Sequence, residues 1–269
     1  MAHQTLVAAK WLLSKKSELE IKFHEFKWGT GYGIPLFDFE ISILGGRHSG
    51  RGSSTDQNLA FEKAAAEALE RFVCFENGVS TEGVAAHSIA EFADHNAGRE
   101  AIERHLFHWH LNTKTPFLSD IALSNTQKTS QAVVARGGTI SWMKLRPAWA
   151  YESSLCLIEK DDRKFLGIGL GDNADGTQLH AAIEALRNFA AYCENKEQFL
   201  EAAEANPDLW CCNSSFLESH RNVFENPGIA SAAAIAPTNF PVHRETLASL
   251  SIKDIPLTFV RATIPGGRL

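Results

Sequence analysis

Polar and apolar residues alternate over some stretches of the chain and follow helical spacing over others. Stretches rich in β-branched and aromatic residues predict strands. These stretches cover 21–28, 36–44, 132–134, 139–145, 153–158, 165–169 and 257–264. Stretches rich in Ala, Leu and Glu predict helices. They cover a helix capped at 53–55 and ending near 76, further helices at 88–110, 176–193, 197–205 and 244–250, and a short one near the start of the chain, whereas 207–237 is ambiguous.

The order of these elements predicts the fold class. Strands and helices intermingle along the chain, which favours an α/β (α+β) fold, a mixed β-sheet with helices packed on it. No segment has the composition of a disordered linker. We therefore expect residues 1–269 to form a single domain, large enough to bury a sizeable core.

Composition narrows the classes of function. The net charge of −6 argues against a general nucleic-acid binder. No apolar run approaches the length of a membrane span, and residues 1–16 contain no signal-peptide cleavage pattern. The five cysteines are odd in number and form no C-x-x-C pair, so neither a disulfide framework nor a zinc site is indicated. These features favour a cytoplasmic protein that needs neither membrane nor nucleic acid. The cysteines are Cys74, Cys156, Cys193, Cys211 and Cys212.

Two five-residue segments nearly repeat each other, EALER at 67–71 and EAIER at 100–104. On a helix, residues three apart share a face, so each segment presents two carboxylates side by side. If the two helices pack together, four carboxylates converge, and such a cluster needs cations because like charges raise one another's pKa. Hard oxygen ligands of this kind suit Mg²⁺, which usually accompanies nucleotide phosphates. The four carboxylates belong to Glu67, Glu70, Glu100 and Glu103.

A simpler interpretation of the same segments stays open. Glu67 with Arg71, and Glu100 with Arg104, are spaced as ion pairs between residues i and i+4. Each such pair stabilises an exposed helix by only about 0.3–0.5 kcal/mol. On that interpretation both segments are solvated helix faces without a ligand.

A glycine-rich segment precedes the first of these helices. GGRHSGRG at 45–52 resembles a P-loop but has Arg51 in place of lysine and Gly52 in place of the hydroxyl residue. A glycine loop that leads into a helix still offers backbone N–H groups to a phosphate. The alternative is a plain loop whose glycines serve the turn. On a helix, His108 and His110 project in different directions, and His105 and His108 could share a metal but have no third ligand beside them.

Taken in order, these pieces resemble the YcaO family. GIP at 33–35 is similar to the family's early strand entry, and SGRGS at 49–53 followed by EALER is similar to its G-K-G … E-A-x-E-R segment. GVAA at 83–86 followed by EAIERHLF at 100–107 is similar to a second acidic segment. Residues 167–187 are similar to a later helix, and 255–266 to the closing V-P-G segment.

The resemblance implies an ATP- and Mg²⁺-dependent enzyme that activates a peptide backbone amide during the maturation of a ribosomally made peptide. In the family, a side chain or an outside nucleophile attacks the amide carbonyl, and the oxyanion takes the γ-phosphoryl group of ATP. Thiazoline or oxazoline rings, thioamides or amidines result. The resemblance places Mg²⁺ on Glu67, Glu70, Glu100 and Glu103. The residues that it implies for the nucleotide are Arg51, Lys63, Arg71, Arg104, Glu184 and Arg187.

Several positions depart from the family pattern. Lys63 stands in place of a serine, Ser88 of an asparagine, Phe92 of a glutamate, Arg51 of a lysine and Arg187 of a glutamine. The chain also lacks the family's usual middle segment and its proline-rich C-terminal tail. We expect a shortened member that acts with a precursor peptide and as a homo- or hetero-oligomer with another biosynthetic protein. The alternative is a catalytically inactive subunit that binds the peptide or a partner enzyme.

Overall fold

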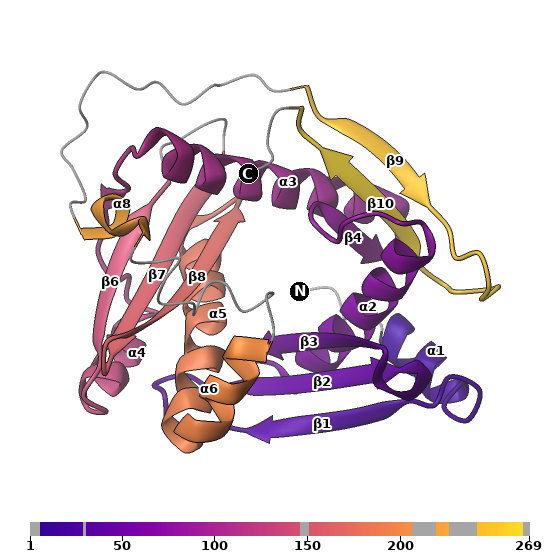
Figure 1. The fold of residues 1–269 in the computed structure, drawn as a ribbon, viewed down its shortest axis with the longest axis horizontal. Coiled ribbons are helices and arrows are strands. Elements are labelled where there is room, and N and C mark those ends of the chain that lie inside the picture. Colours follow the sequence, from indigo (N-terminus) through magenta and orange to yellow (C-terminus); the bar gives the residue numbers. More distant parts are fainter. Residues whose placement is uncertain (1–5, 29–30, 146–150, 206–218, 226–240, 266–269) are drawn as a thin grey trace. The chain divides into compact units, whose positions relative to one another are not determined.

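A computed structural model describes residues 6–28, 31–145, 151–205, 219–225 and 241–265 (Figure 1). Cys211, Cys212 and most of the ambiguous stretch at 207–237 lie outside these residues. The chain divides into two compact units. The first consists of residues 1–29, 35–104 and 241–266, and the second of residues 30–34, 105–240 and 267–269.

The first unit begins with a three-stranded sheet. Helix α1 (Val7–Ser14) precedes β1 (Lys22–Lys27), β2 (Phe37–Ile43), a short 3-10 turn (Leu44–Gly46) and β3 (His48–Ser54). The strands pair antiparallel in the order β1-β2-β3. Helix α2 (Gln57–Glu76) follows at once, with Asp56 as its N-cap, and packs on β2 and β3. Asp56 accepts a hydrogen bond from the Leu59 N–H at 2.9 Å, which satisfies a free donor of the first turn.

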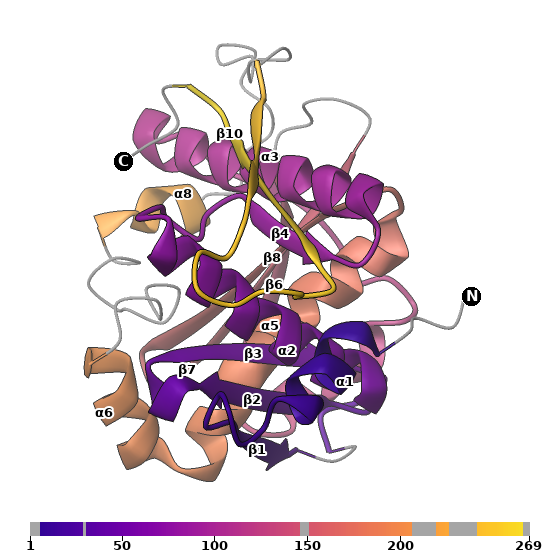
Figure 2. The same cartoon turned by 90° about the vertical axis from the view of Figure 1, so that its right-hand side faces the viewer.

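A second sheet completes this unit. Strands β4 (Val84–His87), β9 (His243–Leu247) and β10 (Thr258–Thr263) pair antiparallel in the order β4-β10-β9. Helix α3 (Ala90–Thr113) runs beside β4 and β10 (Figure 2). Its small residues Ala93, Ala97 and Ala101 form a core with residues of β4 and β10. Only residues up to Arg104 of α3 belong to the first unit.

The second unit repeats the pattern of strands followed by a helix. Strands β5 (Leu118–Ser119), β6 (Thr139–Lys144), β7 (Glu152–Lys160) and β8 (Arg163–Gly171) pair antiparallel in that order. Helix α5 (Ala174–Glu194) packs on β7 and β8, with Asn173 as its N-cap. The remaining helices are α4 (Gln127–Val134), α6 (Lys196–Ala205) and α8 (Arg221–Glu225).

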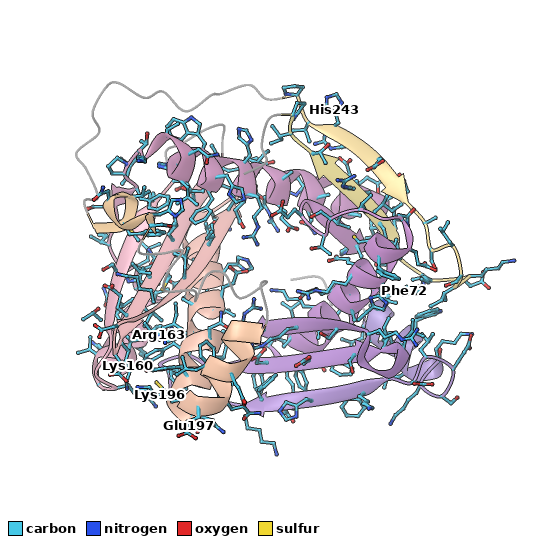
Figure 3. All side chains as sticks on the ribbon, viewed as in Figure 1. Phe72, Lys160, Arg163, Lys196, Glu197 and His243 are labelled. Atoms are coloured by element: carbon cyan, nitrogen blue, oxygen red, sulfur yellow. The ribbon has the colours of Figure 1, made fainter. Side chains whose placement is uncertain are left out.

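Each unit buries its own aromatic core. In the first, Phe72 of α2 is 4% exposed and its ring centre lies 5.4 Å from that of His48 (Figure 3). In the second, Phe165 of β8 contacts Phe189 and Tyr192 of α5, with ring centres 5.7 and 5.3 Å apart. These apolar contacts anchor α2 and α5 to their sheets.

The α+β class expected from the sequence is confirmed. The ladders among the described strands are antiparallel, however, and form three sheets rather than one mixed sheet. The reason is the length of the connections: β2 and β3, like β7 and β8, are joined by hairpins too short for a parallel crossover. No helix in the described part of the chain is long and apolar enough to cross a membrane.

Three local predictions are wrong. Residues 132–134 end helix α4, in which Thr129 and Val133 are buried one turn apart. Residues 244–250 were expected to be helical, but 243–247 form edge strand β9, whose long-range pairing with β10 overrides a polar sequence. The glycine segment at 45–52 is not a loop throughout, because 48–54 form β3. Gly50 and Gly52 serve the approach of a helix rather than a turn.

Candidate functional site

Two glutamates of α2 are fixed by main-chain N–H groups of edge strands. Glu67 Oε2 accepts a hydrogen bond from the Arg51 N–H of β3 at 3.1 Å. Glu70 Oε1 accepts one from the Ala86 N–H of β4 at 2.6 Å. Strands β3 and β4 each lie at an edge of their sheet, where main-chain donors are not used by a neighbouring strand. One oxygen of each carboxylate is therefore anchored to the backbone.

Glycine makes this approach of α2 to β3 achievable. A β-carbon built on Gly50 would lie 2.2 Å from Ala68 N, and one built on Gly52 would lie 2.0 Å from Ala60 O. Both distances are far below van der Waals contact, and both atoms belong to the helix backbone. Only residues without a side chain bring the helix close enough for Glu67 to reach β3.

A third carboxylate, Glu100 of α3, acts on Glu70. Burial raises the pKa of Glu70 well above its usual value, and the charges of Glu100 and Glu67 raise it further. The Ala86 N–H and Arg71 act in the opposite direction. Arg71 donates to Glu67 Oε1 from Nε at 3.2 Å and from Nη2 at 2.9 Å. Glu67 and Glu100 thus each lie within electrostatic reach of Glu70, and these three carboxylates form the carboxylate cluster.

The remaining candidates occupy different places. Glu103 of α3 is buried, with 8% exposure, and Arg104 beside it is half-buried. Lys63 is exposed on α2. Glu184 and Arg187 belong to α5 in the second unit. Their assignment to the nucleotide stays a prediction.

The chemistry of the cluster suits a divalent cation. Its donors are hard carboxylate oxygens, and the charges of Glu100 and Glu67 add to the burial that raises the pKa of Glu70. Whether the side chains are already arranged to hold a metal ion is a separate question. Among the residues with described positions, no group of three or more His, Cys, Asp or Glu side chains is arranged to hold a metal ion. Glu67 is engaged by Arg51 and Arg71, so a cation would have to share or displace Arg71.

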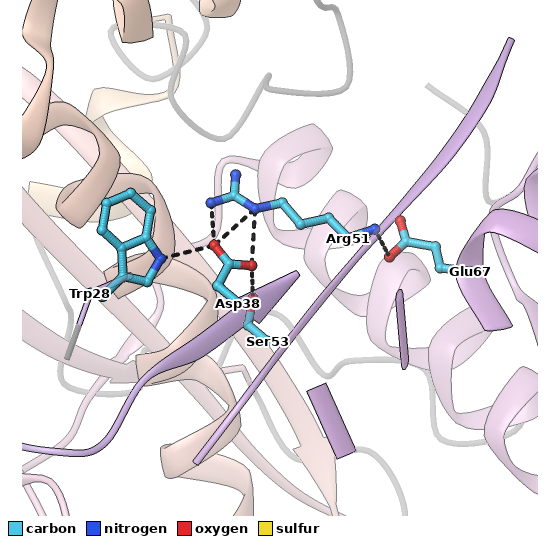
Figure 4. A network of polar contacts seen from close by, with 5 residues as sticks. All are labelled: Trp28, Asp38, Arg51, Ser53 and Glu67. Carbon is cyan, nitrogen blue, oxygen red and sulfur yellow. Dashed lines mark hydrogen bonds and ion pairs between the residues drawn. The ribbon is translucent and has the colours of Figure 1, made fainter. Parts of the chain in front are cut away.

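The backbone N–H and the side chain of Arg51 point in opposite directions (Figure 4). Its N–H meets Glu67, whereas its guanidinium binds Asp38, with Nη2 2.5 Å and Nε 3.1 Å from the carboxylate. Trp28 Nε1 and Ser53 Oγ also donate to Asp38, at 3.0 and 2.8 Å. The guanidinium lies over the ring of Phe26, 4.6 Å from its centre. The side chain expected at a phosphate is thus held by a buried acid.

Sequence reasoning missed Asp38. A single aspartate in an alternating strand carries no motif, and its 0% exposure follows only from the paired strands. Its opposite charge to Arg51, which was already a candidate, was the available signal. Antiparallel pairing places Asp38 opposite Ser53. Arg51 lies two residues before Ser53 on β3, so it is on the same face of the sheet as Asp38.

The chain is similar to known proteins in structure rather than in sequence. No protein-family model matches the sequence, and neither does any curated protein. A structure of YcaO from Methanopyrus kandleri bound with AMPPCP and Mg²⁺ superposes with a TM-score of 0.66 at 13% identity, over 97% of this chain and 90% of that one. A heterocyclase in complex with substrate and cofactor gives 0.66 at 10% identity, over all of this chain but 53% of its own.

A third solved structure is also similar to this chain. The microcin synthetase McbBCD complex of E. coli contains a chain that matches with a TM-score of 0.54 at 9% identity, over 86% of this chain and 84% of that one. At such identities the likeness establishes the fold alone. It agrees with the resemblance seen in the order of sequence motifs. This chain has the YcaO fold.

Proposed function

We propose that the chain is a YcaO-like component of a cytoplasmic system that modifies a ribosomally made peptide, and that it activates a backbone amide with ATP and Mg²⁺. The observation that carries the proposal is that Glu67 and Glu100 both lie close enough to the buried Glu70 to raise its pKa. Two proteins of the same fold support it, one bound with AMPPCP and Mg²⁺ and one in complex with substrate and cofactor.

In this proposal each residue has a defined task. Glu67, Glu70, Glu100 and Glu103 would hold Mg²⁺, which when bound supplies positive charge at the nucleotide phosphates. Arg71 would exchange its contact with Glu67 for one with phosphate. Arg51, Lys63, Arg104, Glu184 and Arg187 would complete the contacts to the nucleotide. The chain's contribution is mainly the positioning and charge compensation that phosphoryl transfer requires.

The amide to be activated comes from a precursor peptide. A nucleophile attacks the amide carbonyl, the resulting oxyanion takes the γ-phosphoryl group of ATP, and phosphate leaves when the azoline or thioamide forms. We propose that a partner protein or a second copy assists, since a neighbour of the same fold works in the McbBCD complex. Residues 1–269 would act as one YcaO-like domain built from the two units.

Two observations favour the alternative of a non-catalytic subunit. The guanidinium of Arg51 is bound to Asp38 and directed away from Glu67 (Figure 4). Phe92 also replaces a glutamate of the family pattern, and its side chain is 53% exposed. A subunit that binds the peptide or a partner enzyme without turnover would tolerate both features.

Calorimetry and phosphate release separate the two functions. Binding of a non-hydrolysable ATP analogue with Mg²⁺ is measured first, then phosphate release with precursor peptide and partner. The variants are Glu67→Gln, Glu100→Gln and Arg51→Ile, and Glu18→Gln, an exposed glutamate on the same unit, is the control. Catalysis predicts release that both cluster variants abolish and the control keeps. No nucleotide binding by the native chain in any mixture would refute the enzyme and leave the binding subunit.

A further inference from the structure

The two units contain the same strand–helix segment. The sequence GxG at 50–52 recurs at 167–169, and AAxEALxxF at 64–72 recurs at 181–189. A constant shift of 117 residues relates the two copies, as from Gly50 to Gly167 and from Glu67 to Glu184. No insertion or deletion interrupts this correspondence from β3 through α2 to β8 through α5. Both copies end a run of antiparallel strands.

The N-caps of the two helices correspond as well. Asp56 accepts from the Leu59 N–H at 2.9 Å, and Asn173, at the same position of the second copy, accepts from the Gly176 N–H at 2.7 Å. Each helix therefore starts at the same residue relative to its glycines. The hairpins before them differ by two residues, since Ile41 pairs with Gly50 but Cys156 pairs with Gly167.

The close approach of helix to strand is also duplicated. A β-carbon on Gly167 would lie 2.0 Å from Ala181 O, and one on Gly169 would lie 2.5 Å from Thr177 O. Ala181 and Thr177 stand to these glycines as Ala64 and Ala60 stand to Gly50 and Gly52. In both copies the obstacle is helix backbone, which no side-chain rotation can move away.

The glutamate contact is the same in both copies. Glu184 Oε2 accepts from the Ile168 N–H at 3.1 Å, as Glu67 Oε2 accepts from the Arg51 N–H at 3.1 Å. Strand β8, like β3, is the edge strand of its sheet. The second oxygen of each glutamate lies beside a basic side chain. Arg71 donates to Glu67, and His180 Nε2 lies 3.6 Å from Glu184 Oε1.

We propose that Gly50 with Gly52, and Gly167 with Gly169, are positioning residues that set the reach of Glu67 and Glu184 by the same duplicated device. Their missing side chains bring each helix to the distance at which its glutamate binds the edge amide. The functional part of this inference rests on the proposed nucleotide site, in which both glutamates take part. The positional part does not depend on any ligand.

The two copies have diverged beside the shared glutamate. Glu70 and Arg71 of the first correspond to Arg187 and Asn188 of the second. The first copy therefore carries a second carboxylate where the other carries a guanidinium. With the glutamate held alike, this exchange suits the first copy to a cation and the second to an anionic group such as a phosphate.

Amide hydrogen exchange tests the positioning. Gly50→Ala should accelerate exchange of the Arg51 amide at least about tenfold and leave Ile168 unchanged, while Gly167→Ala should do the reverse, because each loses one charge-assisted hydrogen bond. The two variants thus control each other. The Phe165 and Gly169 amides, whose residues pair with β7, report unfolding of the second unit. Gly98→Ala, which meets only the end of the Arg244 side chain, is a further control.

Binding of an ATP analogue with Mg²⁺ then distinguishes the effect of the position of Glu184 from the effect of its charge. Glu184→Gln should keep Ile168 protected, because the amide oxygen still accepts, yet weaken binding by losing the charge. Gly167→Ala should keep the charge, expose Ile168 and weaken binding about tenfold or more. An unchanged Ile168 amide in Gly167→Ala overturns the inference. Absence of nucleotide binding in the native protein refutes the proposed function, while exchange still decides the positioning.

Discussion

The carboxylate of Asp38 is completely shielded from solvent and binds the guanidinium of Arg51 through Nε and Nη2. The second unit lacks this pair. At the positions equivalent by strand pairing and by the 117-residue shift it has Ser153 and Ile168. The same strands and helix therefore form without an ion pair. Buried pairs often contribute little net stability, because desolvation offsets their attraction.

Removing only one partner of the Asp38–Arg51 ion pair should lower the free energy of unfolding far more than removing both partners. Asp38→Ser leaves the guanidinium without its counter-charge, and we expect the free energy of unfolding to fall by about 2–3 kcal/mol. The double variant Asp38→Ser/Arg51→Ile, which copies the second unit, should recover to within about 1 kcal/mol of the native protein. Urea denaturation measures all three.

An exposed ion pair is the matched control for that cycle. Glu18 binds Lys15 at 3.0 Å with 61% of its side chain exposed. Glu18→Ala should therefore change the free energy of unfolding by less than about 0.5 kcal/mol. If the double variant proves as unstable as Asp38→Ser, the pair stabilises the fold, and the comparison of the two units is misleading.

The carboxylate cluster predicts opposite effects of Glu70→Gln with and without Mg²⁺. Burial and the charges of Glu100 and Glu67 raise the pKa of Glu70, so its ionised form destabilises the metal-free protein at neutral pH. Glu70→Gln should raise the metal-free melting temperature. It should also abolish any increase that Mg²⁺ produces in the native chain.

Differential scanning fluorimetry with and without millimolar Mg²⁺ measures both effects. Glu82→Gln, an exposed glutamate in the turn before β4, serves as the control and should respond to Mg²⁺ like the native chain. A native melting temperature that Mg²⁺ leaves unchanged, even with an ATP analogue present, would contradict a cation site at this cluster.

The sequence indicates the helices of this site better than its contacts. Helical spacing places Glu67 and Glu70 on one face because that relation is local. The partners Arg51 and Ala86 lie 16 residues away on different strands. No spacing rule shows that Glu67 meets the edge of one sheet and Glu70 the edge of another. Those contacts depend on strand order, which long-range pairing decides.

The glycines show the same limit of prediction from sequence. The segment at 45–52 was expected to be a phosphate-binding or turn-forming loop, since a loop is the usual place for glycine. Gly50 and Gly52 instead lie within a strand that a helix approaches closely. The recurrence of GxG and AAxEALxxF at one constant shift was readable in the sequence.

Glu62 should stabilise the first helix of the chain. Its two carboxylate oxygens accept from the Ala8 and Ala9 N–H groups at 2.8 and 2.9 Å, whereas the N-cap Leu6 provides no side-chain acceptor. Glu62→Ala removes both acceptors and a favourable charge at the helix N-terminus. We expect a loss of about 1–2 kcal/mol in unfolding free energy, and Glu62→Gln should lose less because its amide oxygen still accepts. An equal loss for both variants would show that charge, rather than hydrogen bonding, dominates.

Glu76 predicts how the first unit responds to acid. Burial alone would raise its pKa, but hydrogen bonds from the Ser249 and Ser251 hydroxyls and from the Leu250 and Ser251 N–H groups lower it below the usual value. A lowered folded-state pKa contributes stability above the unfolded pKa, and that stability is lost as the pH falls towards the folded value. Below about pH 4.5, the unfolding free energy of the native chain should therefore decrease more steeply with acidity than that of Glu76→Gln.

Chemical denaturation between pH 7 and pH 3 measures this difference. At pH 7, Glu76→Gln should be less stable by about 1 kcal/mol, since neutral acceptors form weaker hydrogen bonds than carboxylates. The two curves should converge in acid, where Glu76 is protonated. Glu245→Gln, which loses an exposed partner of Arg261, is the control. Parallel curves over the whole range would show that Glu76 holds residues 249–251 without using its charge.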